Sequence, residues 1–338
     1  MASSRAGATG GSKPDQLLLK WRRSDLHYRK AGDTPLLTMP LPIVSHPDYD
    51  AEFPANHRFP MGKYRALQAA LTRRGLLGNG SSHRPEPADA ALLSLAHDRA
   101  YVDQVIGCAV PRHIEREIGF AVGERVSRRA RLASAGTLLA AELALEYGIA
   151  CNAAGGSHHA RRSQGAGFCT LNDVAVAALA LLASARVERI LVVDLDVHQG
   201  DGTADILRDE PAVFTFSMHA ERNFPVRKVA SSLDIGLPDE TGDDAYLGRL
   251  AEILPDLAER ARPDLVFYNA GVDPHRDDRL GRLALSDDGL RRRDEAVISY
   301  FRERDVPLCG VIGGGYATDA AELAERHATL FETAARWC

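Results

Sequence analysis

The segment from Ile190 to Gly202 carries the densest group of side chains that could do chemistry. An apolar run leads directly into Asp194, Asp196, His198 and Asp201. Side chains alternate along an extended chain, so residues 194, 196 and 198 should point the same way. Three ionisable groups are costly to bury beyond a strand unless a cation or hydrogen bonds compensate them. Carboxylate and imidazole two residues apart suit a divalent metal, which makes Asp196 and His198 candidate ligands.

A second apolar stretch, Leu265–Asn269, leads into Asp273 through the letters AGVD. Alone, Asp273 would more readily be explained as a turn residue or a helix cap. At the carboxyl end of another strand, however, it would join Asp196 and His198 as a third ligand. Three protein ligands leave a position open for water or substrate, as a catalytic zinc site requires. We therefore expect Zn²⁺ at these three side chains.

A third polar cluster is the motif GGSHHA at 155–160. Its adjacent histidines, His158 and His159, suit general acid–base catalysis near neutral pH. A carboxylate behind each imidazole would fix its tautomer and raise its basicity, and Asp194 and Asp201 are free for that role. Without the other clusters, the same motif would also fit a surface loop.

A glycine run, 313–315, precedes Tyr316 after another apolar stretch. Glycines at a strand end can let a phenol reach into a cleft, where its hydroxyl could donate to an oxyanion that develops on a carbonyl. By itself the motif fits an ordinary glycine turn. Together with a metal site it makes Tyr316 a candidate catalytic residue and Gly314 a candidate substrate contact.

Apolar strands and helical stretches alternate along most of the chain. Continuous apolar strands between helices predict an α/β fold, with helices on both faces of a mostly parallel sheet. The turn residues of 78–90 indicate a loop. A flexible tail is expected at 1–33 and a single catalytic domain at 34–338. The expected elements are a first strand within 34–45, helices at 61–74 and 124–147, strand 149–154, helix 171–185, strand 189–194, helix 203–208, strand 212–217, helix 243–260, strand 265–269, helix 286–304, strand 306–312 and helix 319–336.

Composition narrows the class of protein. The 338 residues include 41 Lys and Arg against 46 Asp and Glu, a formal charge of −5, which gives no footprint for nucleic acid or anionic membrane. No apolar run reaches the roughly 18 residues of a membrane-spanning helix. The five cysteines form no CxxC pair, which argues against a disulfide framework. Without an export signal, we expect a cytoplasmic protein, although the Ala/Ser/Gly-rich start leaves organelle targeting open.

These clusters, in this order, resemble the zinc-dependent histone deacetylase superfamily, which has the arginase/deacetylase fold. The resemblance covers nearly the whole chain after the tail and implies three αβα layers around a mostly parallel sheet of about eight strands. HQGDG and LPIVSHPDYD (41–50) are similar to the class IV branch and its bacterial relatives. The matching motifs are GGSHHA (155–160), GFCTLND (167–173), DLDVHQGDG (194–202), FSMH (216–219), NAGVD (269–273), DDRLG (277–281) and GGGY (313–316).

The resemblance implies a role for each matching position. The zinc ligands would be Asp196, His198 and Asp273. The tandem histidines would be His158, with Asp194 as its carboxylate partner, and His159, with Asp201 as its partner. The tyrosine that polarises the substrate carbonyl would be Tyr316.

Further matches concern the substrate channel and a second ion. Gly167 and Phe168 would form one wall of a narrow acyl-lysine channel, and Phe224 is a looser match to the opposite wall. Family members also hold K⁺ near the zinc. Its ligands here would be the backbone carbonyls of Asp194, Asp196 and His198, together with Ser217 and Met218.

The resemblance predicts hydrolysis of the amide in an N6-acyl-lysine or a related acylated amine, with acetyl or longer chains left open. Relatives of classes I and II often grip the substrate backbone with an acid on a long rim loop. The stretch after 97–107 is short, and we assign no residue to that task. A binuclear manganese ureohydrolase and a catalytically silent acyl-lysine-binding module are the alternatives. We expect no nucleic-acid or membrane partner, and the sequence leaves the oligomeric state open.

Overall fold

The computed structural model describes residues 39–54, 56–78 and 80–338. The tail expected at 1–33, and the first residues of the domain expected from 34, lie outside the described residues.

The described residues contain a sheet of eight strands in which every neighbouring pair is parallel. The central strands β3, β4, β7 and β8 are buried at every position, which explains their unbroken apolar sequences. The spatial order is β2-β1-β3-β8-β7-β4-β5-β6, with bounds β1 Ile43–Val44, β2 Ser82–His83, β3 Ile149–Asn152, β4 Ile190–Asp194, β5 Val213–Ala220, β6 Leu233–Leu237, β7 Leu265–Asn269 and β8 Leu308–Val311.

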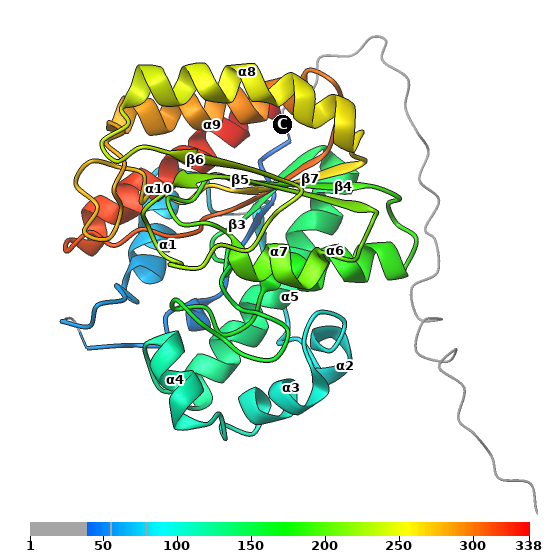
Figure 1. Cartoon of the computed structure of the whole chain (residues 1–338), viewed down its shortest axis with the longest axis vertical. Helices are drawn as coiled ribbons and strands as arrows, with labels where there is room; N and C mark the ends of the chain where they lie inside the picture. Colours follow the sequence, from blue (N-terminus) through cyan, green and yellow to red (C-terminus); the bar gives the residue numbers. More distant parts are fainter. Residues whose placement is uncertain (1–38, 55, 79) are drawn as a thin grey trace, which may run out of the picture. The chain divides into compact units, whose positions relative to one another are not determined.

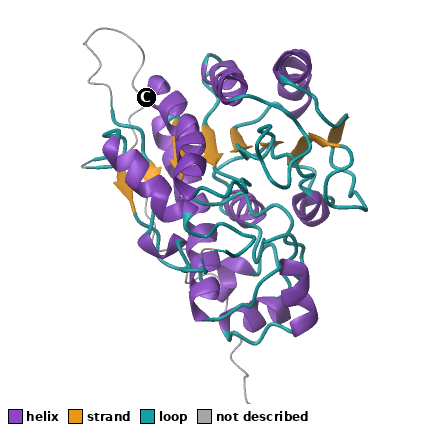
Figure 2. Ribbon diagram, turned by 90° about the vertical axis from the view of Figure 1, so that its left-hand side faces the viewer, coloured by secondary structure: helices purple, strands orange, loops and turns teal. Residues whose placement is uncertain are grey.

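Helices cover both faces of this sheet. Helices α8 and α9 lie on one face, and α5, α6 and α7 lie on the other (Figures 1 and 2). Helices α2, α3 and α4 gather at the lower end of α5, away from the sheet (Figure 1). The described α-helices are α1 Lys63–Arg73, α2 Ala90–Leu93, α3 Arg99–Ile106, α4 Arg112–Ile118, α5 Glu124–Tyr147, α6 Asp173–Ala183, α7 Asp201–Leu207, α8 Asp243–Ala261, α9 Asp287–Arg302 and α10 Ala320–Ala334.

None of the helices in the described part of the chain has both the length and the hydropathy needed to span a membrane.

The four central strands end at the same level. Asp194 pairs with Asn269, Asn269 with Val311, and Val311 with Asn152, and each is the last residue of its strand. The loops that follow β3, β4, β7 and β8 therefore leave one edge of the sheet side by side. These loops are the four polar clusters found in the sequence. The expected fold class, three αβα layers around a parallel sheet, is confirmed.

Other parts of the fold depart from expectation. The stretch 78–90, expected to be a loop, contains the two-residue edge strand β2. Strand β6 was not anticipated, because its sequence LDIGL includes Asp and Gly, which are rare in strands. The predicted strand at 212–217 continues to Ala220. Helices α2, α3 and α4 fall where no element was expected.

Candidate active site

Asp196, His198 and Asp273 converge beyond the carboxyl ends of β4 and β7, and these three candidates form the metal-ligand group. His198 Nδ1 lies 3.1 Å from Asp196 Oδ1 and 3.1 Å from Asp273 Oδ2. One ligand atom from each residue lies within 4.8 Å of the other two, and all three side chains are buried. The N–H groups of Val197 and His198 donate to Asp273 and Asp196, which fixes both carboxylates in place.

The two buried carboxylates of this group favour a positive charge between them. Burial, followed by the charge of Asp196, raises the pKa of Asp273 to about 7. Burial disfavours a charged His198, but its hydrogen bonds to both carboxylates outweigh burial and raise its pKa to about 10. Positive charge at this point is thus stabilised by both carboxylates. One imidazole nitrogen and two carboxylate oxygens at one point fit a catalytic divalent metal such as zinc.

Gly314 leaves the space that this group occupies. A Cβ at position 314 would collide with the carboxylates of both Asp196 and Asp273. The N–H of Gly314 instead donates to Asp196 Oδ2 at 2.7 Å. The loop after β8 can therefore close over the metal-ligand group only because it carries glycine here.

His158 and His159 lie beside this group, and each is backed by a carboxylate. His158 Nδ1 lies 2.7 Å from Asp194 Oδ2, and His159 Nδ1 lies 2.6 Å from Asp201 Oδ1. The two Nε2 atoms face each other at 3.1 Å. Nδ1 of each ring is hydrogen-bonded to a carboxylate, so Nε2 is the nitrogen that could reach a reacting group.

The two imidazoles differ in charge. Burial disfavours the imidazolium at both positions. At His158, the carboxylates of Asp194 and Asp196 outweigh burial and raise its pKa to about 9. At His159, burial and the neighbouring charge of His158 prevail and lower its pKa to about 4. Environments that separate two neighbouring pKa values in this way are typical of acid–base pairs in active sites.

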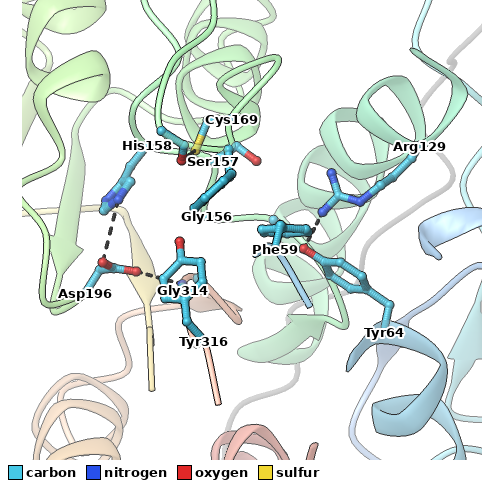
Figure 3. A pocket seen from close by; sticks show the side chains of 14 residues that line it. Phe59, Tyr64, Arg129, Gly156, Ser157, His158, Cys169, Asp196, Gly314 and Tyr316 are labelled. Atoms are coloured by element: carbon cyan, nitrogen blue, oxygen red, sulfur yellow. Dashed lines mark hydrogen bonds and ion pairs between the residues drawn. The ribbon is translucent and has the colours of Figure 1, made fainter. Parts of the chain in front are cut away.

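Tyr316 borders the same space from the loop after β8, and its hydroxyl points into the pocket (Figure 3). Its backbone N–H donates to Asp278 Oδ2 at 2.7 Å, which anchors the residue. Burial, followed by the charges of Asp196 and Asp273, raises the pKa of Tyr316 well above its ordinary value. The phenol therefore stays protonated and can act as a hydrogen-bond donor.

His158, Asp196 and Tyr316 border a narrow pocket with a volume of about 20 Å³, space for roughly one water molecule. The lining combines polar groups on the metal side with aromatic rings opposite them (Figure 3). Its residues are Phe59, Tyr64, Arg129, Gly155, Gly156, Ser157, His158, Gly167, Phe168, Cys169, Asp196, Gly313, Gly314 and Tyr316.

The predicted channel walls also meet at this place. Phe168 packs against Tyr316 with ring centroids 5.6 Å apart, and it has a φ of 66°, which is unusual for a bulky residue. The ring of Phe224 stands edge-on to His159 at 4.8 Å. A Cβ at Gly167 would come within 2.5 Å of His159 and 3.0 Å of Phe224. Phe224 is 44% exposed and does not line the narrow pocket, so it borders the outer part of the site.

Comparison with known proteins supports the family. A sequence profile described as the histone deacetylase domain matches residues 57–331. This chain belongs to the histone deacetylase family. Histone deacetylase 2 of Arabidopsis thaliana is 31% identical over 83% of this chain and 76% of its own length. An uncharacterized protein of a Picosynechococcus strain is 47% identical over 88% of this chain and 99% of its own length.

Solved structures share the histone deacetylase fold of this chain. The HD domain of HDA15 superposes with a TM-score of 0.73 at 22% identity, over 87% of this chain and 89% of that one. An acetylpolyamine aminohydrolase from Burkholderia pseudomallei gives a TM-score of 0.69 at 24% identity, over 87% of this chain and 98% of that one. At these identities the likeness shows the fold alone, and that fold is the expected arginase/deacetylase arrangement. The narrower assignment to class IV stays a prediction.

Sequence reasoning missed the side of the pocket opposite the candidate metal ligands. Phe59, Tyr64 and Arg129 line it, and the Arg129 guanidinium donates to the Tyr64 hydroxyl (Figure 3). Nearby, Lys63 is almost fully buried and donates to the Gly313 carbonyl at 3.1 Å. Burial lowers the pKa of Lys63 to about 8. A lysine at a helical position facing the core was the only signal in the sequence for this group.

The loop that carries the histidines is held by a buried carboxylate that the sequence analysis did not single out. Asp173, at the start of α6, is fully buried. Its Oδ2 accepts from the Gly156 N–H at 3.0 Å, and its Oδ1 accepts from the Ser157 N–H at 2.8 Å. These N–H groups immediately precede His158, so Asp173 fixes the backbone from which the tandem histidines project.

Hydrogen bonds continue from Asp173 to the edge of the sheet. Thr137 in α5 donates to Asp173 Oδ2 at 2.6 Å, and Asn152 at the end of β3 donates to Thr137 at 3.0 Å. The Tyr49 hydroxyl donates to Asn152 Oδ1 at 2.9 Å. All of these side chains are buried. One continuous polar network thus joins Tyr49 to the active-site loop.

The residues expected to bind K⁺ lie on neighbouring strands. Ser217 in β5 pairs in register with Asp194 in β4, and Met218 follows it. The Ser217 hydroxyl lies 2.9 Å from His219 Nδ1. The potassium site stays a prediction.

Proposed function

We propose that this chain is a zinc-dependent deacylase that hydrolyses the amide of an N6-acyl-lysine or a related acylated amine. The products would be a carboxylate and a free amine. One observation carries the proposal. A buried group of three candidate metal ligands adjoins a narrow pocket that is lined by a carboxylate-backed imidazole and a phenol, and a second carboxylate-backed imidazole lies directly beside the first. Membership of the histone deacetylase family supports the same reaction class.

Asp196, His198 and Asp273 would hold the metal through the atoms that now face one another. Zinc bound there would supply Lewis acidity toward the amide carbonyl and an attacking water. The chain contributes by keeping both carboxylates fixed, through the N–H groups of Val197, His198 and Gly314. Two carboxylates and a neutral imidazole would balance the two positive charges of the ion.

The tandem histidines would move the protons. His159 presents a free Nε2 and is held through Nδ1 by Asp201, so it would accept the proton of the attacking water. His158, held by Asp194, would stay positively charged and support the developing negative charge. The proton on the leaving amine would then come from this pair, whose Nε2 atoms are 3.1 Å apart.

Tyr316 would donate its hydroxyl hydrogen to the oxyanion that forms on the substrate carbonyl. A single donor of this kind contributes about 3 kcal/mol to the stability of a transition state. The donor needs no reorganisation during the reaction, because Asp278 anchors the residue and the pocket walls pack against its ring.

The pocket favours a short acyl group. The pocket is narrow, with a volume of about 20 Å³, and Phe59, Tyr64 and Arg129 close its side opposite the candidate metal ligands, so each carbon beyond an acetyl group would require further displacement of the lining. A long fatty chain would have to displace these three side chains and break the hydrogen bond from Arg129 to Tyr64. We therefore propose acetyl, rather than a long acyl chain, as the preferred acyl group, with acetate as the carboxylate product.

A turnover assay with acyl-lysine peptides of increasing chain length tests this proposal. We expect acetyl-lysine to be hydrolysed fastest, a hydroxamate to abolish turnover, and elemental analysis to give one zinc per chain. Acetylated polyamines belong in the same assay as a second class of acylated amine. Failure to hydrolyse any acylated amine with one zinc bound would overturn the deacylase proposal, and a preference for long chains would overturn the acetyl assignment.

The metal count separates this proposal from a ureohydrolase with two manganese ions. Within the described residues, one group with metal-ligand geometry is found, Asp196 with His198 and Asp273. Asp201, which a second metal ion could otherwise use, accepts hydrogen bonds from His159 and Arg161. Turnover itself separates the proposal from a silent acyl-lysine-binding module.

A further inference from the structure

A shallow groove lies beside the outer wall of the active site. Arg112, Glu115, Arg116 and Phe120 line it together with Gly119 and Ala121, and its volume is about 520 Å³, the size of many ligand pockets. The groove is formed by α4 and the turn that follows it.

Backbone and ring contacts connect this groove to the catalytic pocket. The N–H groups of Gly167 and Phe168 donate to the carbonyls of Glu117 and Ile118, at 2.9 and 2.7 Å. The rings of Phe120 and Phe168 are stacked with centroids 6.3 Å apart. Phe168 also lines the catalytic pocket, so the groove begins where the pocket wall ends.

The groove offers positive charge that nothing in the described chain uses. Arg112 and Arg116 are exposed, and neither forms an ion pair or hydrogen bond within residues 39–54, 56–78 and 80–338. Glu115 is the one acid in the lining, and its Oε1 accepts from the Val122 N–H at 2.8 Å. Its carboxylate is therefore already engaged with the backbone, whereas both guanidinium groups are available.

A second part of the outer border of the site has the same sign of charge. Phe224, edge-on to His159, lies in the segment 221–228, which also carries Arg222, Arg227 and Lys228 against one acid, Glu221. Lys228 is bound to the carbonyls of Asn223 and Pro225. Both basic segments border the outer part of the site, so a substrate whose acyl group reaches the metal site must place its carrier near them.

We infer that the groove of Arg112 and Arg116 is a specificity subsite for carboxylate side chains that flank the acyl-lysine in the substrate. The inference rests on the proposed function and adds the substrate class. Exposed charge pairs are individually weak, so two arginines should give a preference of about tenfold for an acidic over a basic flank. Polycationic carriers, such as lysine-rich tails or polyamines, would meet like charges at both borders.

Three acetyl-lysine peptides that differ only in their flanks test the inference, with Glu, Ser or Lys on both sides. For the unmodified enzyme we expect kcat/KM to fall in the order Glu, Ser, Lys, with about tenfold between the extremes, and the ratio to shrink at high salt. Arg112→Ala combined with Arg116→Ala should bring the Glu-to-Lys ratio close to one, mainly through KM. The double Lys variant, Arg112→Lys with Arg116→Lys, should restore most of the preference.

Arg249→Ala combined with Arg260→Ala, on α8 at the far face of the sheet, removes the same charge and should keep the preference. Equal kcat/KM for the three peptides, a preference for Lys flanks, or a ratio that survives loss of both groove arginines would overturn the inference. Turnover of the Ser-flanked peptide reports the deacylase activity separately. If that peptide is not hydrolysed, binding tests the subsite separately from turnover. The fluorescence anisotropy of labelled hydroxamate peptides then gives the ratio of affinities for Glu and Lys flanks, and this ratio should change in the same variants and in the same direction as the kcat/KM ratio.

Discussion

The floor and the mouth of the site are built in different ways. On the floor, the metal-ligand group and the tandem histidines are buried, and hydrogen bonds hold each of their side chains from behind. At the mouth, the side chains of Arg112 and Arg116 are exposed and without partners in the described chain, and Phe224 is half-exposed. From this contrast we expect bond cleavage to depend on the residues fixed at strand ends, and the choice of substrate to depend on the surface segments.

This contrast predicts a kinetic division. Floor variants should lower kcat or abolish metal binding, because they act on groups that touch the reacting atoms. Mouth variants should act mainly on KM. The following changes test this division, in order of decreasing effect.

The largest effect is expected from Asp273→Asn. The amide keeps the size of the side chain but removes one of the two negatively charged ligands. The variant should therefore lose its zinc, and its kcat/KM should fall by about a thousandfold or more. Elemental analysis and a turnover assay measure both. Without metal, the variant should be no less stable to heat than the unmodified chain, because two facing carboxylates no longer repel each other. Stoichiometric zinc in the variant would remove Asp273 from the ligand set.

Tyr316→Phe should lower kcat by about a hundredfold while zinc stays bound, because it removes only the donor to the oxyanion. Tyr246→Phe is the matched control. Tyr246 is also buried, and its hydroxyl has no hydrogen-bond partner among the described residues. Equal kcat values for the two variants would show that the Tyr316 hydroxyl takes no part in the reaction.

Asp173→Asn should have a smaller effect that still falls on the floor. Its NH₂ group would face a backbone N–H donor, so the loop before His158 should loosen and kcat should fall about tenfold, with zinc retained. Asp264→Asn is the control, because Asp264 also accepts two backbone N–H groups, those of Glu188 and Arg189, far from the site. If both substitutions lower only thermal stability, the network has no part in positioning the histidines.

The smallest effect is expected at the mouth. Phe224→Ala removes a half-exposed ring that contacts His159 from outside the narrow pocket, so KM should rise by a few-fold with kcat nearly unchanged. Steady-state kinetics with an acetyl-lysine peptide measures the split. A large drop in kcat would place Phe224 with the floor and weaken the division drawn above.

How much could be predicted from the sequence follows the same division. Strand β7 and helix α5 begin and end where apolar patterning placed them, and the polar residues just after β4, β7 and β8 meet as expected. Patterning works there because buried parallel strands need continuous apolar sequence. Arg129 could not be found in this way. Four arginines lie between 125 and 131, and only tertiary packing determines which of them is buried at the pocket.

The polar network that ends at Asp173 begins at Tyr49, eight positions ahead of the segment that the family profile matches. A protein trimmed to residues 57–331 would keep every proposed catalytic side chain and still lose the phenol that satisfies Asn152, along with strand β1. Shortened versions for crystallisation or screening should therefore start ahead of residue 41. Otherwise, poor turnover could be mistaken for a wrong substrate.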